Sequence, residues 1–354
     1  MMKKNLLKNR FSAVTMAWKT MTWGVLSGLF LLSSCTEETT AEVEETVLES
    51  QKLSFTLAPD PSELIVVEGI TDAGAIEKTT SAAGPDRGRF NITLKYLIPP
   101  SERQQAVFEA AAERWERIII KDVPSFTGTL PSAFQGVPPV LDNETVDDVI
   151  IEVVLAPIDG PGQILGQAGP RFVRTSDYLT LSGVMFFDID DLDFLDQIDL
   201  FEEVIVHEMG HVLGVGTLWN AGGRTLLQGS AEEPFFAGKK ANVFWNAEGG
   251  AYELPIENTG GPGTAYGHWR ESVLNNELMT GYLNLGENPL SRITAGSMKD
   301  LGYGAASVGE SYDLPKGTEG VNTAVTREAD GDMGIHIAER EILLQPIGVV
   351  NIKK

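Results

Sequence analysis

The sequence predicts an α/β (α+β) fold in which a twisted mixed sheet and its helices lead into one long buried helix. The order of patterns supports this. A strand pattern at 90–98, a helical pattern at 101–120 and strand patterns at 149–157 and 183–188 precede a second helical pattern at 199–213. The chain has 354 residues, 42% of them hydrophobic and 22% charged, which is enough apolar material for a sizeable core.

Residues 1–34 have the features of a secretory signal peptide. Five basic residues and no acid lead into an apolar run that is shorter than the about 20 residues of a membrane span. The run exits through LLSSC, whose Cys35 is the one cysteine of the chain, and this exit resembles the lipobox of bacterial lipoproteins. The resemblance implies cleavage before Cys35 and acylation of its thiol. The alternatives are a transmembrane anchor and a free thiol.

The net charge of the chain limits the classes of molecule that it can bind. The formal charge is −23, and removing a signal region with five basic and no acidic residues leaves −28. Such a surface repels phosphate backbones and anionic lipid heads, so we expect no nucleic-acid binding. A lipid on Cys35 would instead hold the protein at the bacterial cell envelope, at the outer membrane and either periplasmic or surface-exposed. The lone cysteine also excludes an internal disulfide.

Three segments flank the predicted catalytic region at 89–305. Residues 35–52 hold many glutamates and few large apolar residues, which predicts a lipidated, acidic and flexible tether. Residues 53–88 contain strand-like pieces and are either an N-terminal extension or a propeptide. Residues 306–354 read as a C-terminal extension of strands and loops, without a motif. No propeptide cysteine is available to block a metal, so any latency would need another device.

The first helix and a proline-containing strand are predicted in detail. Ser101 and Gln104 have the spacing of a capping box, and the helix they begin carries an apolar stripe. The stripe consists of Ala106, Val107, Ala110, Ala111, Trp115 and Ile118. The segment 166–174 (GQAGPRFVR) contains Pro170, which favours a strand at the edge of the sheet.

The chemistry is predicted at His207-Glu208-Met209-Gly210-His211, an HExxH motif. Histidines four residues apart lie on one helix face and can both reach one zinc ion. Glu208 can then lie beside the metal-bound water as a general base. Apolar residues surround the motif, which predicts a buried helix, and buried histidines without a metal would need other partners.

Both ends of this helix have sequence signals. Asp199 and Glu202 have capping-box spacing at its start, and Gly214 suits a left-handed stop at its end. HExxHxxG resembles the metzincin opening. Most metzincins place a third histidine three residues after that glycine, where this chain has Thr217. Zinc needs a third protein ligand and an open fourth position.

His268 is the candidate for the third zinc ligand, and Met279 is the candidate for the methionine beneath the metal. His268 lies in GHWRES, and Met279 follows eleven residues later in ELMT, in the manner of a Met-turn. A third histidine displaced by an insertion, here 215–267, resembles the leishmanolysin-like peptidases, as does PLSRITAGSMKDLGY at 289–303. The resemblance covers about residues 90–303.

The resemblance implies a metzincin-like catalytic domain of two lobes. A mixed sheet and helices would form the N-terminal lobe, a mostly irregular lobe would follow, and the zinc cleft would lie between them. It also implies three zinc ligands at His207, His211 and His268, a general base at Glu208 and a Met-turn at Met279. Familiar members are rich in disulfides and this chain has none, so the region after about 305 need not match them.

His336, Tyr282 and an acidic run before the metal helix are the other polar residues that could take part in a site. We expect no role for His336, and packing rather than metal contact for Tyr282. An acidic run precedes the metal helix and offers oxygen ligands for a Ca²⁺ ion, but it lacks the glycine and the final glutamate of an EF-hand loop, which favours a solvated, helix-leading run. The run consists of Asp188, Asp190, Asp191, Asp193, Asp196 and Asp199.

The sequence therefore predicts a monomeric, zinc-dependent endopeptidase that hydrolyses peptide bonds of protein or peptide substrates through a metal-activated water. An extended substrate would pair with the strand at 166–174. Two alternatives stay open. One is a surface binding protein or cell adhesion protein that kept the metzincin scaffold without activity, and the other is a zinc hydrolase that acts on a non-peptide bond.

Overall fold

The computed structural model describes residues 54–71, 89–261, 263–314 and 334–353, all within the unit Lys52–Lys354. The predictions for the signal peptide, for Cys35 and for the acidic tether fall outside the described residues. No helix in the described ranges has both the length and the apolar character that a bilayer crossing requires.

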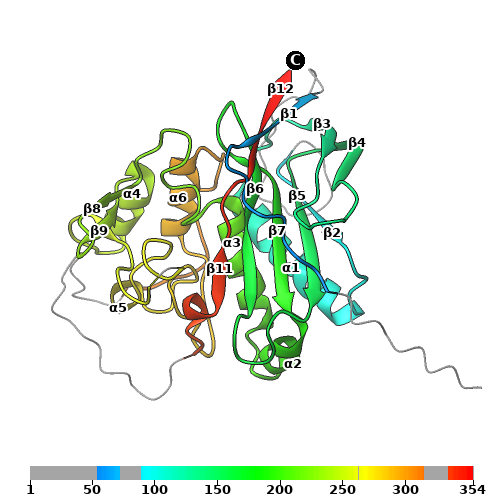
Figure 1. Ribbon diagram of the computed structural model, residues 1–354. Coiled ribbons are helices and arrows are strands. Elements are labelled where there is room, and N and C mark those ends of the chain that lie inside the picture. Colours follow the sequence, from blue (N-terminus) through cyan, green and yellow to red (C-terminus); the bar gives the residue numbers. More distant parts are fainter. Residues whose placement is uncertain (1–53, 72–88, 262, 315–333, 354) are drawn as a thin grey trace, which may run out of the picture. The chain divides into compact units, whose positions relative to one another are not determined.

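A large mixed sheet runs through the molecule, with helices packed against it (Figure 1). β2, β5 and β7 are parallel, β6 runs antiparallel to β7, and β12 and β1 continue parallel to β6. The strands are, in spatial order, β2 (Ile92–Tyr96), β5 (Val149–Ala156), β7 (Thr180–Asp188), β6 (Gly166–Arg174), β12 (Gly348–Lys353), β1 (Ile65–Ile70), β3 (Phe126–Leu130) and β4 (Leu141–Val146). The prediction of a mixed α/β fold is confirmed.

The two central strands are buried on both faces, as their continuous apolar sequences predict. Side chains alternate between the faces because successive residues of a strand point in opposite directions. In β5, Ile151 and Val153 join the main core with the helices, whereas Val154 packs on the opposite side with Phe134 and Phe186. The strands predicted at 149–157 and 183–188 are therefore confirmed.

Helix α1 (Glu102–Ile118) begins as predicted. The Ser101 side chain accepts from the Gln104 N–H at 3.2 Å, and the Gln104 side chain accepts from the Ser101 N–H at 2.8 Å. The predicted stripe is right at Val107, Ala111, Trp115 and Ile118, whereas Ala110 is half-buried and Ala106 is exposed. The buried face consists of Val107, Phe108, Ala111, Ala112, Trp115, Glu116 and Ile118.

The prediction that 166–174 forms an edge strand is wrong. β6 has β7 on one side, and β11 (Glu341–Leu343) and β12 on the other. Pro170 lacks an N–H and is tolerated here because the register with β7 shifts between Pro170 and Phe172. A proline in a strand indicates either an edge or such an irregularity, and the sequence does not distinguish them.

Strands from both flanking segments enter this sheet. β1, from the segment at 53–88, pairs with β12, from the segment at 306–354, over six consecutive residues. β12 also pairs with β6, so it lies in the interior of the sheet.

The remaining elements lie around the metal helix. α2 packs against α3 and against the end of β7, and α4 packs against α6. A small sheet has the order β10-β9-β8. The bounds are α2 (Ile189–Gln197), α3 (Phe201–Leu213), β8 (Leu227–Gly229), β9 (Pro234–Phe236), α4 (Lys239–Ala247), β10 (Leu254–Pro255), α5 (Glu271–Leu274), α6 (Arg292–Leu301) and the 3-10 helix η1 (Ile337–Glu339).

Candidate metal centre

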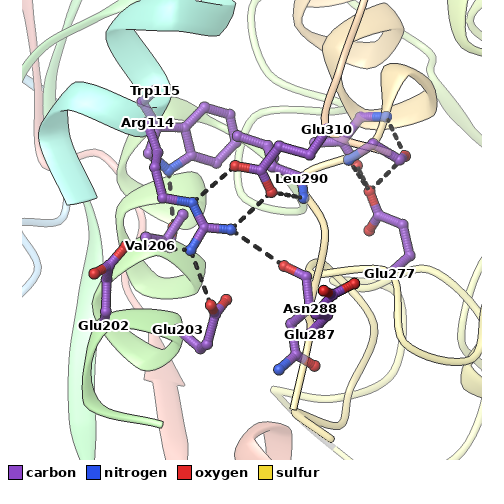
Figure 2. A network of polar contacts seen from close by, with 12 residues as sticks. Arg114, Trp115, Glu202, Glu203, Val206, Glu277, Glu287, Asn288, Leu290 and Glu310 are labelled. Atoms are coloured by element: carbon purple, nitrogen blue, oxygen red, sulfur yellow. Dashed lines mark hydrogen bonds and ion pairs between the residues drawn. The ribbon is translucent and has the colours of Figure 1, made fainter. Parts of the chain in front are cut away.

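Helix α3 carries the HExxH motif through the core. Every residue from Val204 to Leu213 is buried, and α1 holds the helix in place because Trp115 Nε1 donates to the Val206 carbonyl at 2.8 Å (Figure 2). The predicted capping box at Asp199 and Glu202 is wrong. The N-cap is Leu200, which has no side-chain cap. The N-terminus of α3 therefore has no stabilising side-chain cap, and the helix is stabilised by the burial of its apolar residues.

The helix ends at Gly214, whose φ of 117° is the left-handed conformation. The turn that follows places the Val215 carbonyl 2.9 Å from His211 Nδ1. Thr217, at the position where most metzincins have a histidine, donates its hydroxyl to the His211 carbonyl at 2.7 Å. Thr217 therefore stabilises the turn below the helix and is not a ligand.

The segment 215–267 is a closed excursion that returns next to its start. A Cβ on Gly216, which has a φ of 73°, would lie 2.3 Å from the Gly267 carbonyl oxygen, so the two backbones touch. Trp219 near the start stacks on Trp269 just beyond the end, with ring centroids 5.0 Å apart. His268 is thereby returned to the face of α3 that carries the other two histidines.

The three histidines converge on one point. Their Nε2 atoms are separated by 3.0 Å (His207 to His211), 3.2 Å (His207 to His268) and 3.0 Å (His211 to His268). Tetrahedral zinc with bonds of about 2.0–2.1 Å needs donor separations of about 3.3 Å. The arrangement therefore matches a single zinc ion closely.

Each histidine is oriented by a backbone carbonyl. The Nδ1 atoms of His207, His211 and His268 lie 2.7, 2.9 and 3.0 Å from the carbonyl oxygens of Leu278, Val215 and Thr264. A carbonyl can only accept, so Nδ1 carries a proton in each ring and Nε2 is the nitrogen left to bind a metal. All three Nε2 atoms are thus aimed at the same point.

Met279 lies beneath the helix and is fully buried. A Cβ on Gly210 would meet its Sδ at 2.7 Å, so the glycine of HExxH makes room for the methionine. Glu277, labelled in Figure 2, shapes the turn. Its Oε2 accepts from the Met279 N–H at 2.7 Å, and its Oε1 accepts from the Ser291 and Thr294 hydroxyls. The same turn presents the Leu278 carbonyl to His207.

A fourth residue, Glu341 at the start of β11, completes the cluster. One carboxylate oxygen lies 2.8 Å from His268 Nε2, and the other lies 3.3 Å from His207 Nε2 and 3.7 Å from His211 Nε2. Among the described residues, His207, His211, His268 and Glu341 form one of two clusters that could hold a metal ion. Sequence reasoning missed Glu341, since no spacing or motif distinguishes it from the other acids.

Glu208 lies beside this cluster with both carboxylate oxygens buried and without a hydrogen-bond partner, whereas the buried oxygens of Glu341 face the histidine Nε2 atoms. Burial and the nearby Glu341 carboxylate raise the pKa of Glu208 well above its ordinary value. Burial opposes ionisation of Glu341, but His268 and His211 outweigh it and lower the pKa of Glu341 well below its ordinary value. Two buried carboxyl groups beside three converging histidine nitrogens fit a zinc ion, which would compensate the buried negative charge.

The other polar residues singled out in the sequence lie elsewhere. His336 stacks on Tyr282 with ring centroids 4.0 Å apart, so Tyr282 packs as expected and neither belongs to the metal cluster. Asp188 caps α2 and also accepts from the backbone N–H groups of 158–160. The acidic run is therefore only partly solvated, since Asp188 and Asp191 are buried, and it gives no support for a Ca²⁺ site.

Comparison with known proteins gives an independent result. The family model for leishmanolysin matches residues 237–327, about a quarter of the chain. No curated protein matches the chain. The match contains His268 and Met279 but not HExxH, so the motif and the match are separate observations of one site. Together they show that part of this chain is similar to leishmanolysin, a metallopeptidase family, and that the chain contains a cluster able to hold a metal ion.

Proposed function

We propose that the protein is a zinc-dependent endopeptidase that hydrolyses peptide bonds of protein or peptide substrates. The observation that carries the proposal is the convergence of three histidine Nε2 atoms within 3.0–3.2 Å of one another, beside the unpaired carboxyl group of Glu208. We further infer that the substrate lies between the sheet and the segment around the Met-turn, as the two-lobed architecture of leishmanolysin-like enzymes implies.

His207, His211 and His268 would hold the metal, and zinc supplies Lewis-acid polarisation of the scissile carbonyl and acidification of a bound water. Glu208 would act as the general base, taking a proton from the attacking water and giving it to the leaving amine. Gly166 in β6 lies next to Glu208, since a Cβ there would lie 3.6 Å from Glu208 Oε1.

Metal analysis combined with a peptide-library cleavage assay, with and without a chelator, tests this function. The assay uses wild-type protein and Glu341→Ala, because Glu341 lies where water or substrate would bind. We expect cleavage that a chelator inhibits. Adding Glu208→Ala to whichever of the two proteins cleaves should lower the cleavage rate about 10²-fold or more, while the zinc content stays the same. Cleavage that survives Glu208→Ala would show that Glu208 is not the base.

A surface binding protein without activity is the second candidate. It is favoured by one observation: Glu341 adds a fourth side-chain donor and the ligands are fully buried, as in a structural zinc site. One zinc per chain without cleavage by either wild type or Glu341→Ala would support this candidate. A substrate screen with ester and other non-peptide bonds addresses the remaining alternative of a different hydrolase.

We also propose that a lipid on Cys35 anchors the enzyme to the bacterial cell envelope, as the LLSSC exit implies. Cys35→Ser should shift the protein from the membrane fraction to the soluble fraction, as measured by fractionation and immunoblotting. A nearby Ser33→Ala variant, which keeps the thiol, serves as the control. Persistent membrane association of Cys35→Ser would exclude the lipid as the anchor.

A further inference from the structure

Residues 335–343, the covering segment, lie across the metal centre between two parts of the molecule. In Figure 1 its strand β11 (red) runs beside β6, on the side of the sheet that faces α5 and α6. The covering segment is not part of the leishmanolysin match, which ends at residue 327. Its backbone bonds to both sides of the metal centre, and its Glu341 side chain reaches the three histidines.

On one side the covering segment adds a strand to β6. Glu341–Leu343 pairs in parallel with 166–168. The Leu165 N–H donates to the Arg340 carbonyl at 2.7 Å, and the Leu344 N–H donates to the Ala168 carbonyl at 2.8 Å. This part of β6 passes directly beside Glu208. An extended substrate that paired with β6 near the metal would need the position that β11 occupies.

On the other side the covering segment is bonded to the residues around the Met-turn. Ile335 and Leu283 exchange two backbone hydrogen bonds of 2.8 and 2.9 Å. The Ala338 N–H donates to the Gly281 carbonyl at 3.3 Å, and its carbonyl accepts from the Thr264 hydroxyl at 2.8 Å. The covering segment thus bridges the sheet and the Met-turn region, and its own main chain makes the bonds on both sides.

At the centre of this bridge, Glu341 extends its carboxylate to the three histidines. The carboxylate is within 2.8–3.7 Å of all three Nε2 atoms, and the side chain is fully buried. A catalytic zinc has three protein ligands and an open position for water, whereas four protein ligands are typical of a closed site. Glu341 is placed to fill the position that water needs.

We propose that the covering segment keeps the enzyme latent, with Glu341 as a fourth zinc ligand and β11 in the place of the substrate strand. The proposal rests on the proposed peptidase function. It supplies the latency device that a chain without a propeptide cysteine lacks. Activation then requires β11 and Glu341 to leave while the sheet stays intact.

The strand pairing allows such a partial release. β11 has three residues and borders only β6, whereas β12 has six residues and pairs on both sides. Pro346 lies between them and cannot donate to β6, so the ladder is interrupted there. The covering segment can therefore detach as far as Pro346 without disturbing β12.

The first test measures coordination without relying on activity. The protein is loaded with Co²⁺, whose visible spectrum reports the number and kind of ligands, and is titrated with azide. We expect Glu341→Ala and Glu341→Gln to change the spectrum and to bind azide, while wild type does not. Glu339→Ala, in the same segment but 60% exposed, is the control and should match wild type. Glu341→Gln keeps the side-chain volume, should the alanine variant fail to fold.

The second test compares peptide cleavage by the zinc-loaded proteins. In the proposed latent state the Glu341 ligand ties β11 to the metal, so its removal should free the water position and favour release of β11. If the open state is below about a tenth of wild-type molecules, Glu341→Ala should raise kcat/KM about tenfold or more. Equal spectra and equal activity in wild type and Glu341→Ala would overturn the latency proposal and leave the peptidase function standing. A changed spectrum with equal activity in the two proteins would also overturn it. A changed spectrum without cleavage by either protein would refute the peptidase function, leaving a closed structural zinc site.

Discussion

At the scale of single residues, the metal centre depends on carbonyl groups as much as on histidines. The carbonyls of Leu278, Val215 and Thr264 fix the three imidazole tautomers. The sequence predicts the histidines, because HExxH and a later histidine with a Met-turn have recognisable chemistry. It does not predict the carbonyls, since every residue has one and only the folded turns aim them. Glu341 escapes prediction for the same reason, because it reaches the site through strand pairing.

A substitution of Glu277 tests whether the turn that carries the Leu278 carbonyl is needed to orient His207. Glu277→Gln places an NH₂ group against the Met279 N–H or against the Ser291 N–H, so one buried bond is lost in either orientation. We expect a loss of about 1–3 kcal/mol in the free energy of unfolding, measured with urea, and weaker zinc binding in a chelator competition. Glu287→Gln, an exposed neighbour in Figure 2, should leave both quantities unchanged. Equal effects of the two substitutions would contradict the argument.

At the scale of elements, burial patterns were the reliable guides. The sequence predicts β5 and β7 well because burial on both faces leaves a continuous apolar run. It predicts α1 well because burial on one face leaves apolar residues at helical spacing. Two predictions failed where several structures satisfy one local signal. Pro170 suits an irregularity inside the sheet as well as an edge, and Asp199–Glu202 has capping spacing without being used as a cap.

The excursion 215–267 makes an element-scale prediction. Gly216 and Gly223 both have left-handed φ values, 73° and 80°, but only at Gly216 would a Cβ strike the backbone, 2.3 Å from the Gly267 oxygen. Gly216→Ala should therefore push the two ends of the excursion apart and displace His268. We expect a lower melting temperature and at least about tenfold weaker zinc binding by chelator competition.

Gly223→Ala is the matched control, because nothing lies within 4 Å of its added Cβ. It should cost only the strain of a left-handed alanine, about 1–2 kcal/mol, and keep normal zinc affinity. Zinc affinity that falls equally in both variants would show that backbone strain, and not the contact with Gly267, is responsible.

At the scale of the whole molecule, a charge network joins helices α1 and α3 to the chain beyond the Met-turn (Figure 2). Arg114 bonds to Glu310 through two nitrogens at 3.0 and 2.8 Å, to Glu203 at 3.0 Å and to the Asn288 carbonyl at 3.2 Å. Glu310 also accepts from the Leu290 N–H at 2.7 Å. Residues nearly 200 positions apart are thus fixed to one guanidinium, which no local pattern in the sequence predicts.

This network predicts a pH dependence. Burial raises the pKa of Glu203 from 4.5 to about 7, although Arg114 opposes the shift. Between these values the folded protein holds more protons than the unfolded one, so its stability falls as pH rises. The contribution of Glu203 is fully present below about pH 4.5 and is lost as pH rises through about 7. The loss is at most about 1.4 kcal/mol per pH unit.

Glu203→Gln mimics the protonated side chain and should remove this part of the pH dependence. Urea denaturation between pH 5 and 8 should give a shallower decline in stability for Glu203→Gln than for wild type. Glu202→Gln, whose carboxylate is 43% exposed and 3.6 Å from Arg114, should follow wild type. Parallel curves for Glu203→Gln and wild type would refute the role of Glu203.

The interior position of β12 also constrains the order of events during synthesis. Gly348 pairs with Ile65, 283 positions earlier, and with Phe172, so neither neighbour has its partner until residue 353 has been made. Until then β6 and β1 each present an unpaired edge that invites aggregation, and such distant pairing forms slowly. Nascent chains should therefore depend on chaperones late in translation. Because Glu341 lies only seven residues before β12, the metal centre receives its carboxylate at nearly the same stage that joins the two halves of the sheet.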